Sequence, residues 1–296
     1  MKNNFYRAVF LILLAILLFD IQGAIIKKLG KEFSIPQIAF YRNLFGLIPS
    51  LILLFMSASW QRGQKTWRLP QWRLAVLRGV SIFFAQFCFY LSLTKMELAT
   101  ATTIAFAGPL FITLLSIPIL RHHVGSVRII AVLTGFAGIV MVMQPGSDVF
   151  QWLSLLPVAA AFGYAFSSVL VKLFDDSAET ALINVYTSIV ALICTLALML
   201  GITEYVPPPT IFHWGWLILL GSVGGTAVFT MIAAYRLTQP SNLSPFEYFG
   251  IPFSFILGWL FFDEAPFDKL IPGVFLIVAG GLIILWRERR IQKETQ

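Results

Sequence analysis

Apolar residues dominate ten stretches of this chain, and short polar stretches separate them. A helix crosses a bilayer with about 20 predominantly apolar residues, and each stretch has about that length. Strands of a membrane barrel would alternate apolar and polar residues, which runs such as Val9–Phe19 and Phe275–Trp286 do not do. The pattern therefore predicts ten transmembrane helices, at about residues 5–26, 36–56, 73–94, 98–120, 126–143, 151–173, 180–201, 214–236, 243–262 and 269–286.

The last five stretches repeat features of the first five at an offset of about half the chain. A Leu-Thr pair stands near the end of both the third and the eighth stretch (Leu93-Thr94 and Leu237-Thr238). Since five is odd, two such halves in one membrane face opposite ways. We predict an all-α polytopic membrane protein of ten transmembrane helices in two inverted five-helix repeats, residues 1–146 and 147–296, divided after Pro145-Gly146.

A proline lies midway along both the fourth and the ninth stretch, at Pro109 and Pro252. Proline removes a backbone hydrogen bond and kinks a helix. Two interpretations are open: a shared kink beside a central cavity, or the general frequency of proline in membrane helices. The matched positions favour the kink.

Composition leaves little room for a soluble domain. Hydrophobic residues make up 58% of the chain and charged residues 12%, and the mean hydropathy is +0.83. Ten crossings use about 210 of the 296 residues. The first stretch could be taken for a signal peptide, but its length and the lack of a cleavage signature favour a retained helix.

The net charge of +7 does not point to nucleic acid, because Lys and Arg gather in the cytoplasmic loops of membrane proteins. With the N-terminus inside, fourteen positive residues fall at inner ends and five at outer ends. This favours two cytoplasmic termini in a bacterial inner membrane. The cluster of Lys27, Lys28 and Lys31 at an outer end argues the other way.

Motifs for enzymatic chemistry are missing from the sequence. There is no HExxH, GxSxG or GxxxxGK[ST], and His122-His123 are neighbours that cannot face one site from a helix. Cys88 and Cys194 lie in predicted helices and fit as small apolar side chains. We expect no catalytic residues, no metal and no cofactor.

Ionisable residues inside a membrane span are candidate functional residues, since each costs about 2.5–3.5 kcal/mol at the bilayer centre. Arg78, Gln86 and Tyr90 follow one another at 8- and 4-residue steps, so they share a helix face. The full set of candidates for substrate binding or coupling is Asp20, Gln22, Arg42, Arg78, Gln86, Tyr90, Tyr164, Glu247 and Tyr248.

Simpler interpretations stand beside these. Arg78 can extend to the cytoplasmic surface, and Arg42 can pair with Asp20 in a structural ion pair. The candidate tyrosines can be ordinary core or interface aromatics. Glu247 can serve the site, form a pair, or lie at the interface.

Four segments together resemble the EamA family of the drug/metabolite transporter superfamily. The resemblance covers essentially the whole chain and departs at Arg121-His122-His123, where the family often has an acidic residue such as Glu264 after the ninth helix. The segments are Ile38-Ala39-Phe40-Tyr41-Arg42; Leu98-Ala99-Thr100-Ala101 through Gly108-Pro109-Leu110; Arg128 through Gly135–Val140 to Pro145-Gly146; and Gly258–Glu264 with Pro272-Gly273 and Gly280-Gly281.

The resemblance implies ten helices, a central pocket and transport of a small polar metabolite, such as an amino acid, a nucleoside or a cofactor-like compound. Some relatives take up S-adenosylmethionine. We therefore expect a secondary transporter that works by alternating access between the repeats. The alternatives are a membrane-embedded enzyme and a lipid-translocating or structural membrane protein. The expected partners are a small-molecule substrate and the lipid bilayer. Asp20 and Glu247 motivate the hypothesis that protons are the coupling ion. A homodimer is compatible with the sequence.

Overall fold

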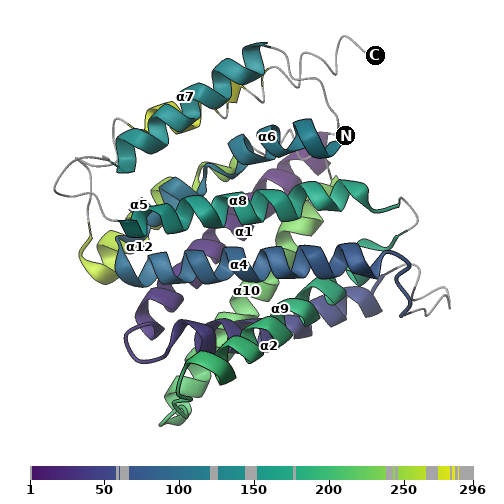
Figure 1. The fold of residues 1–296 in the computed structure, drawn as a ribbon, viewed down its shortest axis with the longest axis vertical. Coiled ribbons are helices and arrows are strands. Elements are labelled where there is room, and N and C mark those ends of the chain that lie inside the picture. Colours follow the sequence, from purple (N-terminus) through teal and green to yellow (C-terminus); the bar gives the residue numbers. More distant parts are fainter. Residues whose placement is uncertain are drawn as a thin grey trace.

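The computed structural model describes residues 2–57, 60, 67–120, 126–143, 152–175, 178–237, 243, 246–264, 273–280, 282–283 and 286. These residues form helices joined by short turns and contain no strand (Figure 1). The helices are α1 (Lys2–Leu29), α2 (Ile35–Phe55), α4 (Trp72–Lys95), α5 (Leu98–Ala105), α6 (Gly108–Leu120), α7 (Ser126–Met143), α8 (Leu155–Leu170), α9 (Thr180–Ile202), α10 (Ile211–Leu237) and α12 (Gly250–Phe262), with short 3-10 turns at Trp152–Ser154 and Val171–Leu173.

Helices meet the main demand of a bilayer, because they satisfy backbone polar groups within one segment. Within the described residues, seven spans are long and apolar enough to cross a membrane, and two apolar helices are shorter (Leu133–Val142 and Gly250–Phe262). The predicted bounds of α1, α2, α4, α7, α9 and α10 lie within three residues of the observed ones. The predicted all-helical membrane fold is confirmed for this part of the chain, whereas the tenth predicted helix is described only in pieces.

The fourth predicted helix is two helices. α5 ends at Ala105, Phe106 and Ala107 form a turn, and α6 starts at Gly108. A turn at Tyr248 and Phe249 likewise precedes α12. Pro109 and Pro252 thus lie in the first turn of α6 and α12, and not midway along an unbroken helix as expected from the sequence. Proline fits a first turn, where its missing N–H would have no intrahelical partner.

Eight helical segments form a closed ring in which the two halves of the sequence alternate. Going round, α1 packs on α10, α10 on α2, α2 on α9, α9 on α4, α4 on α8, α8 on α5 and α6, α5 on α12, and α12 on α1. Each helix of residues 1–146 therefore lies between helices of residues 147–296. Side chains that face the middle of the ring come from both halves.

Glycines allow some of these helices to approach closely. Gly221 of α10 lies against Phe45 of α2, and Gly225, one turn further on, lies against the ring of Pro49. A Cβ at either glycine would collide with these groups. The GxxxG pattern of α10 is thus a packing surface for α2, in accord with the role of small residues between membrane helices.

α7 lies outside the ring, at the top of the bundle in Figure 1. Its Gly138 lies against Gly273 and Ile277 of the helical stretch 273–280. The fifth predicted helix of the first half therefore pairs with part of the last predicted helix of the second.

Candidate functional site

A layer of polar side chains lies inside the ring, where α1, α2 and α4 meet. Gln22 Nε2 donates to the hydroxyl of Tyr90 at 3.3 Å, and Asn43 Nδ2 donates to Gln86 Oε1 at 3.1 Å. All four side chains are buried. At 1.5 Å per residue, the five residues of this layer lie about 8–14 Å from the nearer ends of their helices. We call Gln22, Arg42, Asn43, Gln86 and Tyr90 the polar layer.

Arg42 carries the charge of this layer. Its Nη1 donates to Asn43 Oδ1 at 3.2 Å, and its charge acts on the phenols of Tyr90 and of Tyr164 from α8. Its Nε is buried and has no hydrogen-bond partner. Asn43 in turn donates to Gln86, so two side-chain amides in sequence orient the guanidinium.

Gly224 of α10 makes room for the layer. A Cβ there would collide with Gln22 Oε1 and would lie 3.2 Å from Arg42 Nε. Gln22 Oε1, like Arg42 Nε, is buried without a partner. Two unused polar atoms, an acceptor and a donor, therefore border the same point on the surface of α10.

Asp20 lies on α1 and is buried, with Oδ2 lacking a hydrogen-bond partner. Among the described residues, neither Asp20 nor Arg42 takes part in an ion pair, whereas Lys27 pairs with Glu264 and His213 with Glu32. The Asp20–Arg42 pair considered from the sequence is thus not formed. A buried carboxyl group without a counter-ion is costly as an anion and favours a proton or a cation.

Arg78 is not part of the polar layer. Its Nη1 donates to Thr187 Oγ1 of α9 at 2.8 Å, whereas Gln86 bonds to Asn43 of α2. The shared helix face proposed from the sequence holds for Gln86 and Tyr90. Arg78 sits about 12 Å before Gln86 along α4 and joins α4 to α9.

Glu247 and Tyr248 lie at the turn that precedes α12. The ring of Tyr248 is buried and lies 6.2 Å from the ring of Phe106, the corresponding turn residue of the first half. The Tyr248 hydroxyl has no hydrogen-bond partner, and the charge of Glu247 acts on it. The two turns thus meet through aromatic rings, and the polar atoms here are separate from those of Arg42.

One end of the bundle holds charged contacts that the sequence did not predict. Lys27 Nζ lies 2.7 Å from Glu264 Oε1 and donates to the Met96 carbonyl at 2.5 Å. The other carboxylate oxygen of Glu264 accepts from the Leu98 backbone N–H at 2.9 Å. These bonds join α1, the start of α5 and the end of α12. We call this the Lys27 end, at the left of Figure 1, and the opposite end, where α4 and α9 start, the Arg78 end.

Further bonds join the halves at the Lys27 end. Glu32 Oε2 lies 2.7 Å from His213 Nε2, and the Tyr41 and Tyr205 hydroxyls are 2.9 Å apart. The Gln37 amide donates to the carbonyl of Val206 at 2.6 Å and accepts from its N–H at 3.2 Å. The candidate residues from the sequence do not include these residues or Asn43, although the sequence analysis notes Lys27 and Glu264. The signal that could have indicated them is a polar residue beside or within an apolar run.

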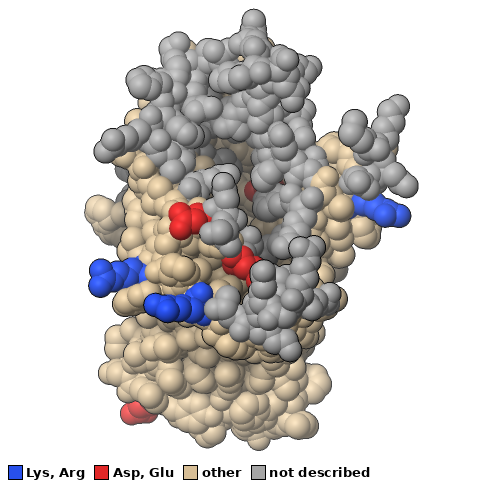
Figure 2. Space-filling model, turned by 90° about the vertical axis from the view of Figure 1, so that its right-hand side faces the viewer, with Lys and Arg blue, Asp and Glu red and all other residues tan. Residues whose placement is uncertain are grey.

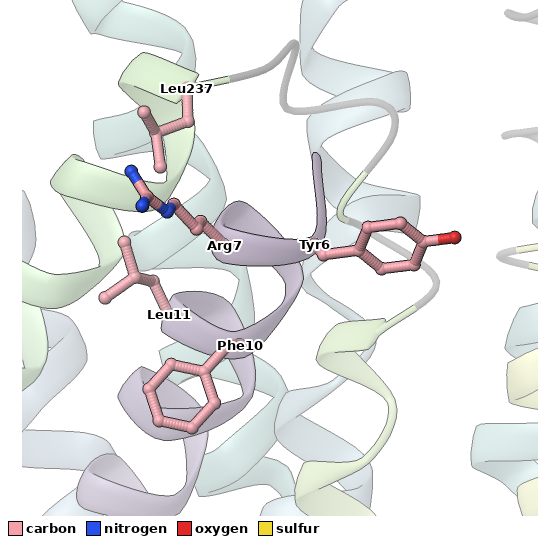
Figure 3. A pocket seen from close by; sticks show the side chains of 5 residues that line it. All are labelled: Tyr6, Arg7, Phe10, Leu11 and Leu237. Carbon is pink, nitrogen blue, oxygen red and sulfur yellow. The ribbon is translucent and has the colours of Figure 1, made fainter. Parts of the chain in front are cut away.

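The Arg78 end carries a cavity of about 530 Å³, lined by Tyr6, Arg7, Phe10, Leu11 and Leu237. Figure 3 shows Arg7 and Leu11 on the side of Leu237, with the Tyr6 ring pointing away. Tyr6 and Phe10 are 70% and 66% exposed, so this is an apolar surface hollow. It is separate from the polar layer.

Neither a metal nor a reactive thiol is indicated in the described part of the chain. No group of three or more His, Cys, Asp or Glu residues there could hold a metal ion, and Cys88 and Cys194 are free thiols. The His122-His123 pair and the Pro145-Gly146 boundary lie outside the described residues.

Comparison with known proteins identifies the family. The sequence pattern of the EamA-like transporter family matches residues 6–144 and again residues 151–286. The chain is 27% identical to an S-adenosylmethionine uptake transporter of Rickettsia prowazekii, over 94% of this chain and 92% of the other. It is 27% identical to a riboflavin transporter of Vibrio cholerae, over 99% and 98%, and 28% identical to a pseudopaline exporter of Pseudomonas aeruginosa, over 94% and 93%.

The fold has a counterpart among solved structures. One crystal structure, 19% identical in sequence, superposes with a TM-score of 0.68 and covers 96% of this chain and 98% of its own. At this identity the match is evidence for the fold alone.

Proposed function

The chain belongs to the EamA-like transporter family, and we propose that it is a secondary transporter that moves a small polar metabolite by alternating access. It is an integral membrane protein and a transporter, not an enzyme. The observation that carries the proposed mechanism is the polar layer: amides, a phenol and a guanidinium from three helices converge inside the ring.

The order of helices in the ring supports ten helices in two inverted repeats. Exchanging each first-half helix for its counterpart pairs α1 with α8, α2 with α9, α4 with α10, and α5 with α12. The exchange turns the observed ring into the same ring read backwards. A two-fold axis in the membrane plane has that effect, and it relates inverted repeats in transporters. The substrate site then lies between residues 1–146 and 147–296.

The distribution of charge supports a cytoplasmic Arg78 end in a bacterial inner membrane. The named relatives come from bacteria, and most Lys and Arg residues fall at the ends that share a side with the N-terminus. Figure 2 shows this end, where Lys and Arg side chains project on both sides and Asp and Glu side chains lie near the middle and at the lower edge. The positive residues then follow the rule for cytoplasmic surfaces.

Proton coupling through Asp20 or Glu247 is the coupling mode we propose. Asp20 has a buried carboxyl oxygen without a partner, and a group of this kind can bind and release a proton within a membrane. Uptake driven by a pH gradient is expected to stop in Asp20→Asn. An unchanged rate in both Asp20→Asn and Glu247→Gln would contradict coupling at these residues.

Transport is tested with purified protein in liposomes and labelled S-adenosylmethionine and riboflavin. Gln86→Leu keeps the side-chain volume but removes the bond to Asn43, so uptake is expected to fall at least about tenfold, as for loss of a buried hydrogen bond of about 1.4 kcal/mol. Ser92→Ala is the matched control on α4, because Ser92 bonds only within its own helix, to the Phe89 carbonyl. Equal uptake by Gln86→Leu and Ser92→Ala would remove the polar layer from the mechanism.

A further inference from the structure

We propose that Arg42 binds a carboxylate of the transported molecule and that Gln22 accepts from its ammonium group, so that the substrate carries an amino-acid end. This inference rests on the proposed transport function and assigns the class of substrate.

The first observation is an unbalanced charge. Arg42 lies about 10 Å along α2 from its start, and it forms no ion pair with a described residue. A cation inside a membrane protein is normally paired or marks a substrate pathway. Since no carboxylate of the described chain pairs with Arg42, an anionic group of the substrate is the fitting partner.

The second observation is the direction of the guanidinium. Nη1 is used by Asn43 at 3.2 Å, and Asn43 is fixed by Gln86. Nε is left without a partner. A carboxylate binds side-on to the edge of a guanidinium that carries Nε, through two parallel hydrogen bonds. The bond to Asn43 therefore holds the guanidinium with its carboxylate-binding edge unused.

The third observation is the acceptor beside this edge. Gln22 Oε1 and Arg42 Nε both border the position that a Cβ of Gly224 would fill. Gln22 uses its Nε2 on the Tyr90 hydroxyl at 3.3 Å, which leaves Oε1 as a buried acceptor without a donor. A free amino acid end supplies both missing partners, because it carries an acceptor carboxylate next to a donor ammonium.

The neighbouring charges fit this class. Within the described residues no carboxylate, that of Asp20 included, forms an ion pair with Arg42. Gly224 is essential to the geometry, since a methyl group at this position would take the space of Gln22 Oε1. Riboflavin has no carboxylate, so the arrangement favours amino-acid-like substrates over it.

The test compares matched ligands on purified protein by thermal shift. The pairs are S-adenosylmethionine with decarboxylated S-adenosylmethionine, and each amino acid with its decarboxylated amine; riboflavin is the unrelated compound. We expect a carboxylate-bearing compound to raise the melting temperature of the wild-type protein and its amine partner to bind about 10- to 100-fold more weakly, as for loss of hydrogen bonds to a charged group. If no carboxylate-bearing compound stabilises the protein more than its amine, the inference is overturned.

Variants locate the effect. Arg42→Gln is expected to bind both members of a pair equally. Arg42→Lys should prefer the carboxylate-bearing member less than the wild type does and more than Arg42→Gln does, because lysine keeps the charge but cannot form two parallel hydrogen bonds to a carboxylate. Arg78→Gln is the matched control, because Arg78 bonds to Thr187 away from the layer; it should discriminate like the wild type. Tight carboxylate binding by Arg42→Gln would overturn the inference.

Failure of the inference can be told from failure of the transport function. Riboflavin uptake that needs Gln86 but not Arg42 would leave transport at the polar layer standing and overturn the carboxylate assignment. The comparison of paired ligands on wild-type protein needs no variant, so a misfolded Arg42→Gln does not affect it.

Discussion

The Lys27 end and the Arg78 end of the bundle are joined in different ways. At the Lys27 end, charged and polar side chains connect α1 with α5 and α12, through Lys27 and Glu264, and α2 with the residues before α10. At the Arg78 end, polar bonds connect α4 and the residues before it with α9 and with the 3-10 turn after α8, as in Arg78–Thr187 and Gln71–Leu173. The described part of α1 there meets α10 through apolar side chains such as Ala8, Ile12 and Ala234.

This difference identifies the parts that move if the protein alternates between two open states. The polar layer lies behind the Lys27–Glu264 pair, so access from that end requires this pair to separate. Access from the other end requires α1 and α10 to part at an apolar contact beside the open cavity. Under the proposed mechanism, this structure would be the form closed at the Lys27 end.

The largest expected effect comes from Glu264→Ala. Lys27, whose side chain is only 11% exposed, would keep its charge without a carboxylate, and the Leu98 N–H would lose its acceptor. We expect the free energy of unfolding to fall by about 2–3 kcal/mol, measured by titration with sodium dodecyl sulfate in mixed micelles. Asp263→Asn is the control: the neighbouring Asp263 is exposed and has a positive φ of 57°, which asparagine also adopts. Equal losses in the two variants would show that the pair contributes nothing.

Gly79→Ala tests the Arg78 end. A Cβ at Gly79 would lie 2.6 Å from the Val190 side chain and 3.0 Å from the Thr187 carbonyl, so α4 and α9 would have to move apart. The expected loss is about 1–2 kcal/mol of stability, measured in the same titration. Gly215→Ala on α10, where nothing lies within 4 Å of the added carbon, should be neutral or slightly stabilising. A neutral Gly79→Ala would show that the two helices are not tightly packed.

Arg78→Met separates the polar bond at this end from the packing. It keeps an unbranched side chain and removes the bond to Thr187 Oγ1, so stability is expected to fall by about 1 kcal/mol. Thr187 still bonds to the Ile183 carbonyl at 2.8 Å, which limits the loss. The control is Arg73→Met, one and a half turns earlier on the exposed side of α4. A loss of stability larger than that of Glu264→Ala would show that the polar bond at the Arg78 end contributes more to stability than the ion pair at the Lys27 end.

Tyr41→Phe has the smallest expected effect. It removes the hydroxyl that lies 2.9 Å from the Tyr205 hydroxyl and leaves the ring stacked on Phe45. The melting temperature should drop slightly, for a loss of about 0.5–1 kcal/mol. Tyr186→Phe, which loses its bond to the Trp67 carbonyl at the Arg78 end, is the matched comparison. If opening at the Lys27 end limits uptake, only Tyr41→Phe raises the uptake rate.

Helix positions were predictable from sequence because each span is a long apolar run with polar flanks. The break between α5 and α6 was not, because apolar residues continue through Phe106 and Ala107. The matched prolines favour a kink at Pro109 and Pro252, whereas the chain breaks just before them and each proline lies in the first turn of the following helix.

Four of the five residues of the polar layer, all except Asn43, are among the candidates that the sequence indicates. The 4-residue spacing of Gln86 and Tyr90 put both on one face of α4, as observed. The same rule places Arg78 with them, but the 8-residue step from Arg78 to Gln86 covers about 12 Å along the helix, far enough for Arg78 to reach another partner. Asn43 was overlooked beside Arg42, and only the arrangement of α2 and α4 in space reveals that it orients the guanidinium.

The alternating ring has a consequence for how the protein is made. A ribosome delivers α1, α2, α4 and α5 to the membrane before any of the helices that separate them in the finished ring have been synthesised. The early helices must therefore wait as loosely associated segments in lipid, and later helices insert between them. Residues 1–146 produced alone would lack their neighbours, whereas the two halves produced together as separate chains have every contact needed to assemble.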